Sequence, residues 1–133
     1  MKVLDASGQV LGRLSSRLAK MLLDGEKITV INADKVVVTG DPEMVVKAFG
    51  KKKVRGDPHH GPYYPKTSNG ILRRSVRGML PYKKAKGREA IRRLYVYAGN
   101  PKDLSGERIG KTTEQIECKY INLGKISEKL RGI

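Results

Sequence analysis

The sequence predicts an α/β fold in a single domain, built on a small and mainly parallel sheet. Residues 2–31 show a strand pattern, an amphipathic helix pattern and a second strand pattern, and this order within about 30 residues is that of a βαβ unit. The second strand, 28–31, is apolar and β-branched without alternation, which is typical of a strand covered on both faces. A chain of 133 residues is long enough to bury one core.

Strand and helix patterns alternate along the first 40 residues. Residues 2–6 form a partly apolar strand, and 11–24 form a helix with one apolar face. Gly25 is a natural cap for the end of that helix. After the second strand, residues 32–35 make a turn or a short helical link into a further β-branched strand over 36–39.

Asp41 marks the start of another helix. It is a good N-cap, and Pro42 follows at the first helical position. Four apolar residues of this helix are expected to face inward: Met44, Val45, Ala48 and Phe49. The helix is expected to close with three cations, which are favourable near a helix C-terminus: Lys51, Lys52 and Lys53.

A pair of basic helices is predicted between residues 69 and 94. The first helix has an apolar half made of Ile71, Leu72, Val76, Met79 and Leu80, and a basic half made of Arg73, Arg74 and Arg77. Pro81 stops it, because proline restricts the residue before it and lacks an amide proton. The second helix, 85–94, stacks Lys84, Arg88 and Arg92 at a spacing of four beside Ala90, Ile91 and Leu94.

The last part of the chain is less regular. Residues 94–98 and 120–123 are predicted strands, the latter at an edge, and 126–130 a short closing helix. Thr112 with Gln115 is a weak capping box. The lone cysteine, Cys118, cannot form an internal disulfide and is interpreted as a packed thiol in preference to a nucleophile.

The charge is concentrated in the middle third of the chain. The chain holds 28 Lys and Arg against 13 Asp and Glu, a net charge of +15. Of these, 15 cations but only the two acids Asp57 and Glu89 fall within 47–93, whereas residues 1–46 hold six of each sign. A merely solvated surface of this kind would repel itself. We therefore expect 51–93 to be a basic, nucleic-acid-binding extension of a core formed by 1–50 and 94–133.

The expected contact residues lie on the predicted helices and on the loop 55–68. In that loop the two histidines face phosphate or a base, or are simply exposed, and a metal site is disfavoured because no further ligand spacing accompanies them. The two loop tyrosines stack on unpaired bases or anchor the loop. The full set is Lys51, Lys52, Lys53, Arg55, His59, His60, Tyr63, Tyr64, Lys66, Arg73, Arg74, Arg77, Lys83, Lys84, Lys86, Arg88, Arg92 and Arg93.

Two other function classes remain open on the residues alone. Gly8 and Gly12 lie between a strand and a helix, and Asp34 follows at the spacing of a ribose-binding acid, as in a nucleotide-binding α/β enzyme. The Gly-x-Gly-x-x-Gly and Gly-Lys-Ser/Thr fingerprints are absent, however, and a turn with a tight helix entry explains both glycines. A DNA-binding module is the second alternative.

Other classes are disfavoured. No Ser/His/acid or Cys/His arrangement can be placed, so no catalytic residue, cofactor or metal is expected. No apolar run approaches the roughly 20 residues that span a bilayer, and no signal-peptide pattern opens the chain. We therefore expect a cytosolic protein with neither a membrane nor a small-molecule substrate as partner.

Several motifs together resemble a known family. The first part of the chain carries Asp5-Ala6, Leu11-Gly12-Arg13-Leu14, Val30-Ile31-Asn32-Ala33-Asp34-Lys35 and Val38-Thr39-Gly40. The middle carries Ser75-Val76-Arg77-Gly78-Met79-Leu80-Pro81, Lys86-Gly87 and Tyr95-Val96-Tyr97-Ala98-Gly99-Asn100. In this order they resemble large-subunit ribosomal protein thirteen, the universal L-thirteen family, and 59–74 is most similar to its archaeal and eukaryotic branch. Residues 101–133 match loosely.

The resemblance implies a more specific fold and function than the residues alone. It implies a three-layer α/β/α fold with a small, mainly parallel central sheet and basic helical and loop extensions. It also implies a structural constituent of the cytoplasmic ribosome that binds large-subunit ribosomal RNA beside neighbouring ribosomal proteins and helps it assemble. No catalysis and no cofactor are implied.

Overall fold

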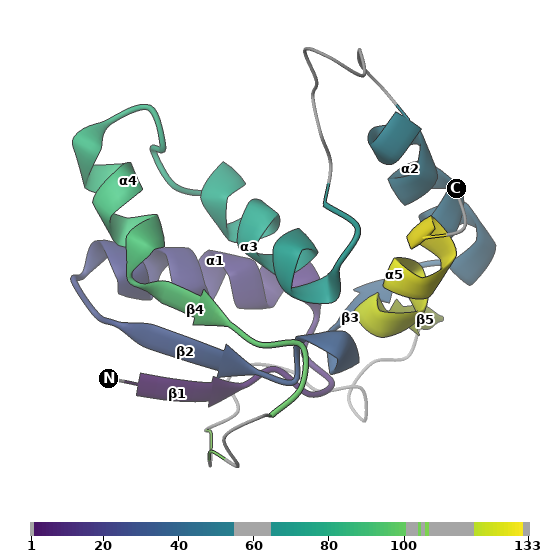
Figure 1. Cartoon of the computed structure of the whole chain (residues 1–133), viewed down its shortest axis with the longest axis horizontal. Helices are drawn as coiled ribbons and strands as arrows, with labels where there is room; N and C mark the ends of the chain where they lie inside the picture. Colours follow the sequence, from purple (N-terminus) through teal and green to yellow (C-terminus); the bar gives the residue numbers. More distant parts are fainter. Residues whose placement is uncertain (1, 55–64, 101–103, 105, 107–118, 132–133) are drawn as a thin grey trace.

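The computed structural model describes residues 2–54, 65–100, 104, 106 and 119–131. Its centre is a three-stranded parallel sheet in the order β1-β2-β4 (Figure 1). The strands are β1 (Lys2–Asp5), β2 (Ile28–Ile31) and β4 (Leu94–Val96). The middle strand β2 is buried along its whole length, as its unbroken apolar pattern predicted. The predicted α/β fold with a small, mainly parallel sheet is confirmed.

Three helices connect these strands: α1 (Leu11–Leu23), α3 (Ser68–Gly78) and α4 (Ala85–Arg92). Crossovers between parallel strands are right-handed, so two crossovers that advance in the same direction across a sheet place their helices on the same face. Figure 1 shows α1, α3 and α4 together on one face of the three-stranded sheet. In the described part of the chain they form the helical layer of this sheet.

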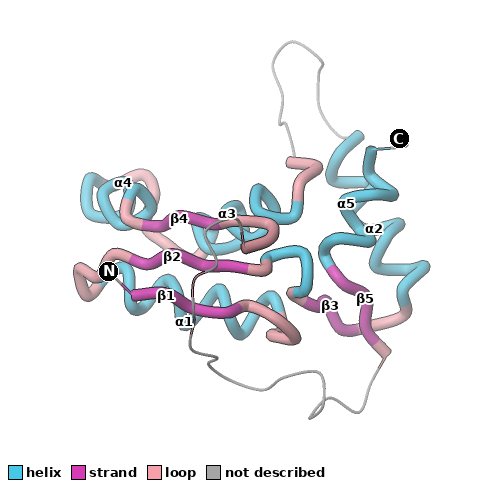
Figure 2. Tube along the Cα trace, turned by 60° about the horizontal axis from the view of Figure 1, so that its bottom comes forward, coloured by secondary structure: helices cyan, strands magenta, loops and turns pink. Residues whose placement is uncertain are grey.

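A second, two-stranded sheet lies beyond the carboxyl ends of the parallel strands (Figure 2). It pairs β3 (Val37–Thr39) with β5 (Tyr120–Asn122) in antiparallel register, which confirms the predicted strands over 36–39 and 120–123. The flanking helices are α2 (Pro42–Val54) and α5 (Leu123–Arg131). A bridge between Val10 and Val37 and the short 3-10 helix η1 (Ala33–Lys35) join this unit to the parallel sheet.

The core lies between the helices and the sheets. Its largest fully buried side chains come from the predicted apolar faces of α1 and α3, from α5 and from the strands: Leu4, Leu14, Leu18, Leu22, Ile28, Ile31, Ile71, Leu72, Leu94, Leu123, Ile126 and Leu130. Burial of this apolar surface is the main favourable term in folding. The same burial determines which sides of α3 and α4 are exposed to solvent.

Two methionines and one alanine predicted to face inward do not. Met79 is 45% exposed, because α3 ends at Gly78 and the chain turns there, so that Leu80 takes the buried position. Met44 is 70% exposed and Ala48 is exposed, because the buried side of α2 lies against α5 and β5 and is filled by Phe49 and the partly buried Val45.

The ends of several elements differ from the sequence prediction. The last strand of the parallel sheet stops at Val96, because the carbonyls of Tyr97 and Ala98 accept hydrogen bonds from η1. The closing helix begins at Leu123 rather than at Ile126. The weak capping box at 112–115 and the cysteine at 118 lie outside the described residues.

Candidate nucleic-acid interface

α3 is held in place at its first turn and along its apolar half. Thr67 caps it by accepting a hydrogen bond from the amide of Gly70 at 3.3 Å. The buried Ser68 hydroxyl donates to the carboxylate of Asp34, which joins α3 to η1. Since the buried half of the helix faces α1 and the sheet, Arg73 and Arg77 are left on its outward half, as predicted.

α4 lies very close to the turn that precedes it. A Cβ on Gly87 would lie 2.1 Å from the carbonyl oxygen of Pro81, so only glycine permits this approach. The amide of Lys84 donates to the same carbonyl at 2.9 Å. One turn further on, Ala90 is fully buried against the core. The turn and the helix are therefore packed as one rigid unit on the sheet.

This unit presents five exposed cations, which we name the basic ridge: Lys83, Lys84, Lys86, Arg88 and Arg92. Three of them follow one another at the predicted spacing of four along α4. Among the described residues between 65 and 93, Glu89 is the only carboxylate, and it is also exposed. The ridge thus has a strongly positive field on a fixed backbone, which suits a polyanion.

The arginines of α3 are held by contacts within the protein. Arg73 donates from Nη1 to the carbonyl oxygen of Leu94 at 2.7 Å. The guanidinium of Arg77 lies over the ring of Tyr82, 4.7 Å from its centre, in a cation–π contact. Arg74 is half-buried. A guanidinium carries five donors, so one internal bond from Arg73 orients the group and leaves donors for a phosphate.

Arg93 has a different position from the rest of the predicted set. It is half-buried, donates to the carbonyl oxygen of Leu22, and has a buried Nε without a partner among the described contacts. The carbonyl of Leu22 lies in the last turn of α1 and also accepts from the amide of Gly25, just past the helix, at 3.1 Å. Arg93 therefore joins the ends of α4 and α1, and its guanidinium is used inside the protein.

Replacing Arg93 with methionine is expected to lower the free energy of unfolding by about 1 to 3 kcal/mol, because the Leu22 carbonyl loses its hydrogen bond from a charged donor and keeps, among the described residues, only the amide of Gly25, at 3.1 Å. Denaturant titration of the purified chain measures this. Arg92→Met is the matched control, since Arg92 is exposed and its neighbour in sequence, and it should change stability by less than about 0.5 kcal/mol. Equal effects of the two substitutions would contradict a structural role for Arg93.

The structure does not bring the whole predicted set together. Lys51 and Lys52 are exposed on α2, which lies with α5 at the opposite end of the molecule from α4 in both views (Figures 1 and 2). The ammonium of Lys52 is 4.9 Å from the ring centre of Phe49. Lys66 is exposed just before α3. The remaining predicted positions, the side chain of Lys53 and residues Arg55, His59, His60, Tyr63 and Tyr64, lie outside the described residues.

Two of the three residues of the alternative nucleotide site, Gly8 and Asp34, have structural partners, and the third, Gly12, lies in the first turn of α1. Gly8 has a φ of 71°, and its amide, which would have to face a phosphate, donates instead to the carbonyl oxygen of Lys35 at 3.0 Å. Asp34, the candidate ribose ligand, accepts from Ser68. A left-handed turn and a link between elements account for these residues without a ligand.

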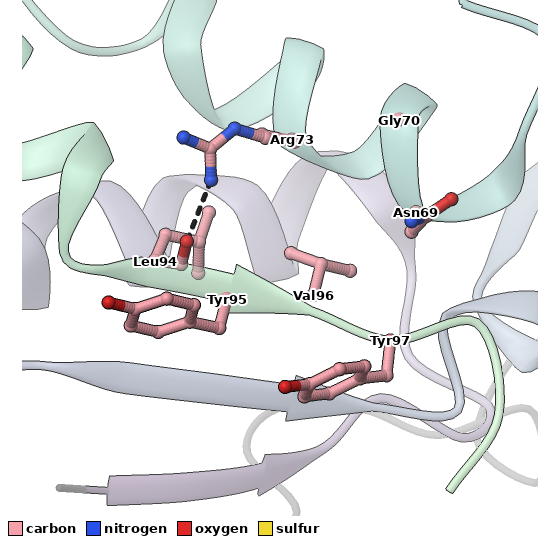
Figure 3. A pocket seen from close by; sticks show the side chains of 7 residues that line it. All are labelled: Asn69, Gly70, Arg73, Leu94, Tyr95, Val96 and Tyr97. Atoms are coloured by element: carbon pink, nitrogen blue, oxygen red, sulfur yellow. Dashed lines mark hydrogen bonds between the residues drawn. The ribbon is translucent and has the colours of Figure 1, made fainter. Parts of the chain in front are cut away.

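A small cavity of about 200 Å³ opens at the edge of β4 (Figure 3). Its lining comes from the first half of α3 and from β4: Asn69, Gly70, Arg73, Leu94, Tyr95, Val96 and Tyr97. Of these, only Arg73 was predicted as a contact residue. The alternation of Tyr95, Val96 and Tyr97 was visible as a strand signal, but only the structure reveals that Tyr95 is 47% exposed beside an arginine.

Two kinds of feature are absent from the part of the chain that the structure describes. No helix there combines the length and apolar character of a membrane-spanning segment. No three His, Cys, Asp or Glu side chains of these residues cluster as metal ligands would.

The chain is similar to known proteins over nearly its whole length. A family model described as ribosomal protein L13 matches residues 1–103. Three archaeal relatives are each described as large ribosomal subunit protein uL13. The protein of Picrophilus torridus is 47% identical over 98% of this chain and 96% of its own length. The protein of Thermoplasma acidophilum is 45% identical over 99% of each chain. The protein of Archaeoglobus fulgidus is 45% identical over 98% of this chain and 89% of its own. With this agreement from end to end, the chain belongs to the ribosomal protein L13 family.

Proposed function

We propose that this protein is a structural constituent of the large ribosomal subunit and that it binds and stabilises large-subunit ribosomal RNA in the cytoplasm. Membership of the ribosomal protein L13 family supports the assignment to the subunit. The observation that carries RNA binding is the basic ridge, five exposed cations beside one carboxylate on a tightly packed helix and turn. Neighbouring ribosomal proteins are its other partners.

The mechanism is neutralisation of phosphates from a rigid scaffold. Because Gly87 and Ala90 fix α4 on the turn and the core, the charges of the ridge are positioned before RNA arrives. Less conformational entropy is then lost on binding. Arginine suits phosphate because its planar fork grips two oxygens at once. Contacts of this kind set position more than sequence, so the shape of the folded RNA supplies the selectivity.

This proposal excludes catalysis. The family is one of ribosomal proteins, and Gly8 and Asp34 of the rival enzyme site are used inside the fold. Thermal unfolding with added nucleotides distinguishes the two functions, because a ligand at 100 times its dissociation constant raises stability by about 2.7 kcal/mol. We expect no shift with mononucleotides or dinucleotides. Competition between structured RNA and duplex DNA separates RNA binding from the DNA-binding alternative.

Replacing Lys84, Arg88 and Arg92 together with alanine is expected to weaken binding to large-subunit RNA roughly 100-fold, at about 1 kcal/mol for each lost phosphate contact. The slope of log affinity against log salt should become shallower by about two to three. Filter binding or fluorescence anisotropy across a salt series measures both quantities.

The matched control removes the same charge elsewhere. Lys119, Lys125 and Lys129 are exposed on or beside β5 and α5, at the other end of the molecule. Their replacement by alanine should cost much less affinity than the triple change in the ridge. If the two triple variants lose affinity equally, net charge rather than the ridge governs binding, and the proposed interface is wrong.

A further inference from the structure

The edge of β4 carries a group of side chains that the basic ridge does not use. Figure 3 shows Arg73 reaching from α3 toward the strand, with Asn69 on the same helix, while Tyr95 and Tyr97 lie together on the other side of the strand. These side chains line the cavity at the edge of β4. Its volume of about 200 Å³ is smaller than the roughly 300 to 1,000 Å³ of sites that enclose drug-sized ligands. It is large enough for one planar ring.

The backbone of β4 adds hydrogen-bonding groups to this cavity. In a parallel pair, successive residues of a strand direct their amides and carbonyls to alternate sides. The amide of Tyr97 and the carbonyl of Arg93 bond to β2, at 2.9 Å and 3.0 Å, so Leu94 and Val96 direct theirs toward the open edge. There the Leu94 carbonyl accepts a hydrogen bond from Arg73. The backbone amide and carbonyl of Val96 are a further donor and acceptor, and the side-chain amide of Asn69 lines the same cavity.

We propose that this cavity takes one unpaired nucleotide of the large-subunit RNA, with its base against the ring of Tyr95 and its phosphate against the guanidinium of Arg73. The proposal rests on the proposed function and names a site within it. Aromatic rings hold unpaired bases by stacking, and a neighbouring arginine supplies the charge that the phosphate needs. A nucleotide lying across the strand edge meets both, because the two side chains flank β4.

The geometry favours RNA over a peptide added to the sheet. β4 is three residues long, and of the two residues that face its open edge, Leu94 already has its carbonyl bonded to Arg73. An added strand would find one complete pairing position, at Val96, whereas strand addition derives its affinity from a series of main-chain hydrogen bonds. The guanidinium in the wall of the cavity also complements a phosphate better than a neutral backbone.

The test uses the full chain, deproteinised large-subunit RNA from an archaeon, and the variants Tyr95→Leu and Tyr95→Phe. We expect Tyr95→Leu to bind roughly 5- to 150-fold more weakly, the range for loss of one base stacked on an aromatic side chain, and Tyr95→Phe to bind like the unsubstituted protein. Chemical probing of base edges should show one unpaired base protected by the unsubstituted protein and by Tyr95→Phe but not by Tyr95→Leu.

Tyr120→Leu is the matched control, because Tyr120 is 42% exposed on β5, away from the cavity. It should bind RNA unchanged. Thermal unfolding verifies that each variant is folded. Ultraviolet crosslinking of the unsubstituted protein needs no variant and should join a base to the peptide that contains Tyr95.

The outcomes separate the two proposals. If the unsubstituted chain does not bind the RNA, both the proposed function and the proposed nucleotide site are wrong. If binding depends on the basic ridge but Tyr95→Leu keeps full affinity and the same protected base, the nucleotide site alone is wrong. If Tyr95→Leu retains its RNA footprint but loses contact with a neighbouring ribosomal protein during subunit assembly, the cavity takes a peptide, and the proposed occupant is overturned.

Discussion

Gly87→Ala is expected to lower the free energy of unfolding by about 2 kcal/mol, although alanine is the better helix former. The added Cβ would lie 2.1 Å from the Pro81 carbonyl oxygen and 2.8 Å from the Tyr82 amide nitrogen. Both atoms belong to the backbone, so relief requires α4 or the turn to move. Overpacking of this kind costs about 1 to 3 kcal/mol or more, which exceeds the gain of up to about 1 kcal/mol from helix propensity.

Gly12→Ala is the matched control for this substitution. Gly12 is also a helical glycine, but no atom lies within 4 Å of a Cβ built on it. Alanine there should leave stability unchanged or raise it by up to about 1 kcal/mol. Denaturant titration compares the two variants. An equal gain for both would mean that α4 and the turn are not closely packed.

The same substitution links packing to function. Moving α4 away from the turn would separate Arg88 from Lys83 without removing any charge. RNA affinity of Gly87→Ala should therefore fall under conditions in which the variant remains folded, while its net charge is unchanged. This result would attribute part of the affinity to the arrangement of the cations rather than to their number.

The sequence predicted those parts of the fold that depend on local pattern. The apolar positions of α1 recur at helical spacing, and Leu14, Leu18 and Leu22 are buried as a result. The exposed row of Lys84, Arg88 and Arg92 follows from the same spacing, because the opposite side of α4 contributes Ala90 to the core. Periodicity reports which side of an element faces inward.

Periodicity does not report which elements contact one another, and the differences between the prediction and the structure concern such contacts. β3 was predicted, but its antiparallel partner β5 lies some 80 residues later, so the division into two sheets could not be derived. Arg93 looks like its basic neighbours in the sequence, yet it bonds to a residue 71 positions away, at the end of another helix. Such a contact depends on tertiary packing, which no local window contains.

The nucleotide site at β4 was missed for the same reason. Tyr95 and Arg73 lie on different elements, and each alone has an ordinary interpretation as a strand residue or a helix cation. Only the approach of α3 to the edge of β4, measured by the 2.7 Å bond from Arg73 to Leu94, brings aromatic ring and guanidinium to one cavity. The loop histidines and tyrosines at 59–64 stay predictions.

The affinity of this protein for large-subunit RNA is expected to fall roughly 10³- to 10⁵-fold between 50 and 200 mM salt. This holds if about six to ten phosphates are contacted, because each neutralised phosphate releases a condensed counterion. The basic ridge provides five cations, and Arg73 and Arg77 of α3 provide two more beside it. Within the described residues of this region only Glu89 opposes them.

Fluorescence anisotropy with labelled RNA over a series of monovalent salt concentrations measures the slope, and the control is the variant with alanine at Lys84, Arg88 and Arg92. The slope of log affinity against log salt should be shallower for this variant by the contribution of those three contacts. The RNA affinities of the two proteins should converge at high salt, where the electrostatic contribution is smallest. A nearly flat response of the unsubstituted protein would contradict phosphate neutralisation. Stacking and hydrogen bonds to bases would then have to supply the affinity, and the cavity at β4, rather than the ridge, would be the principal contact.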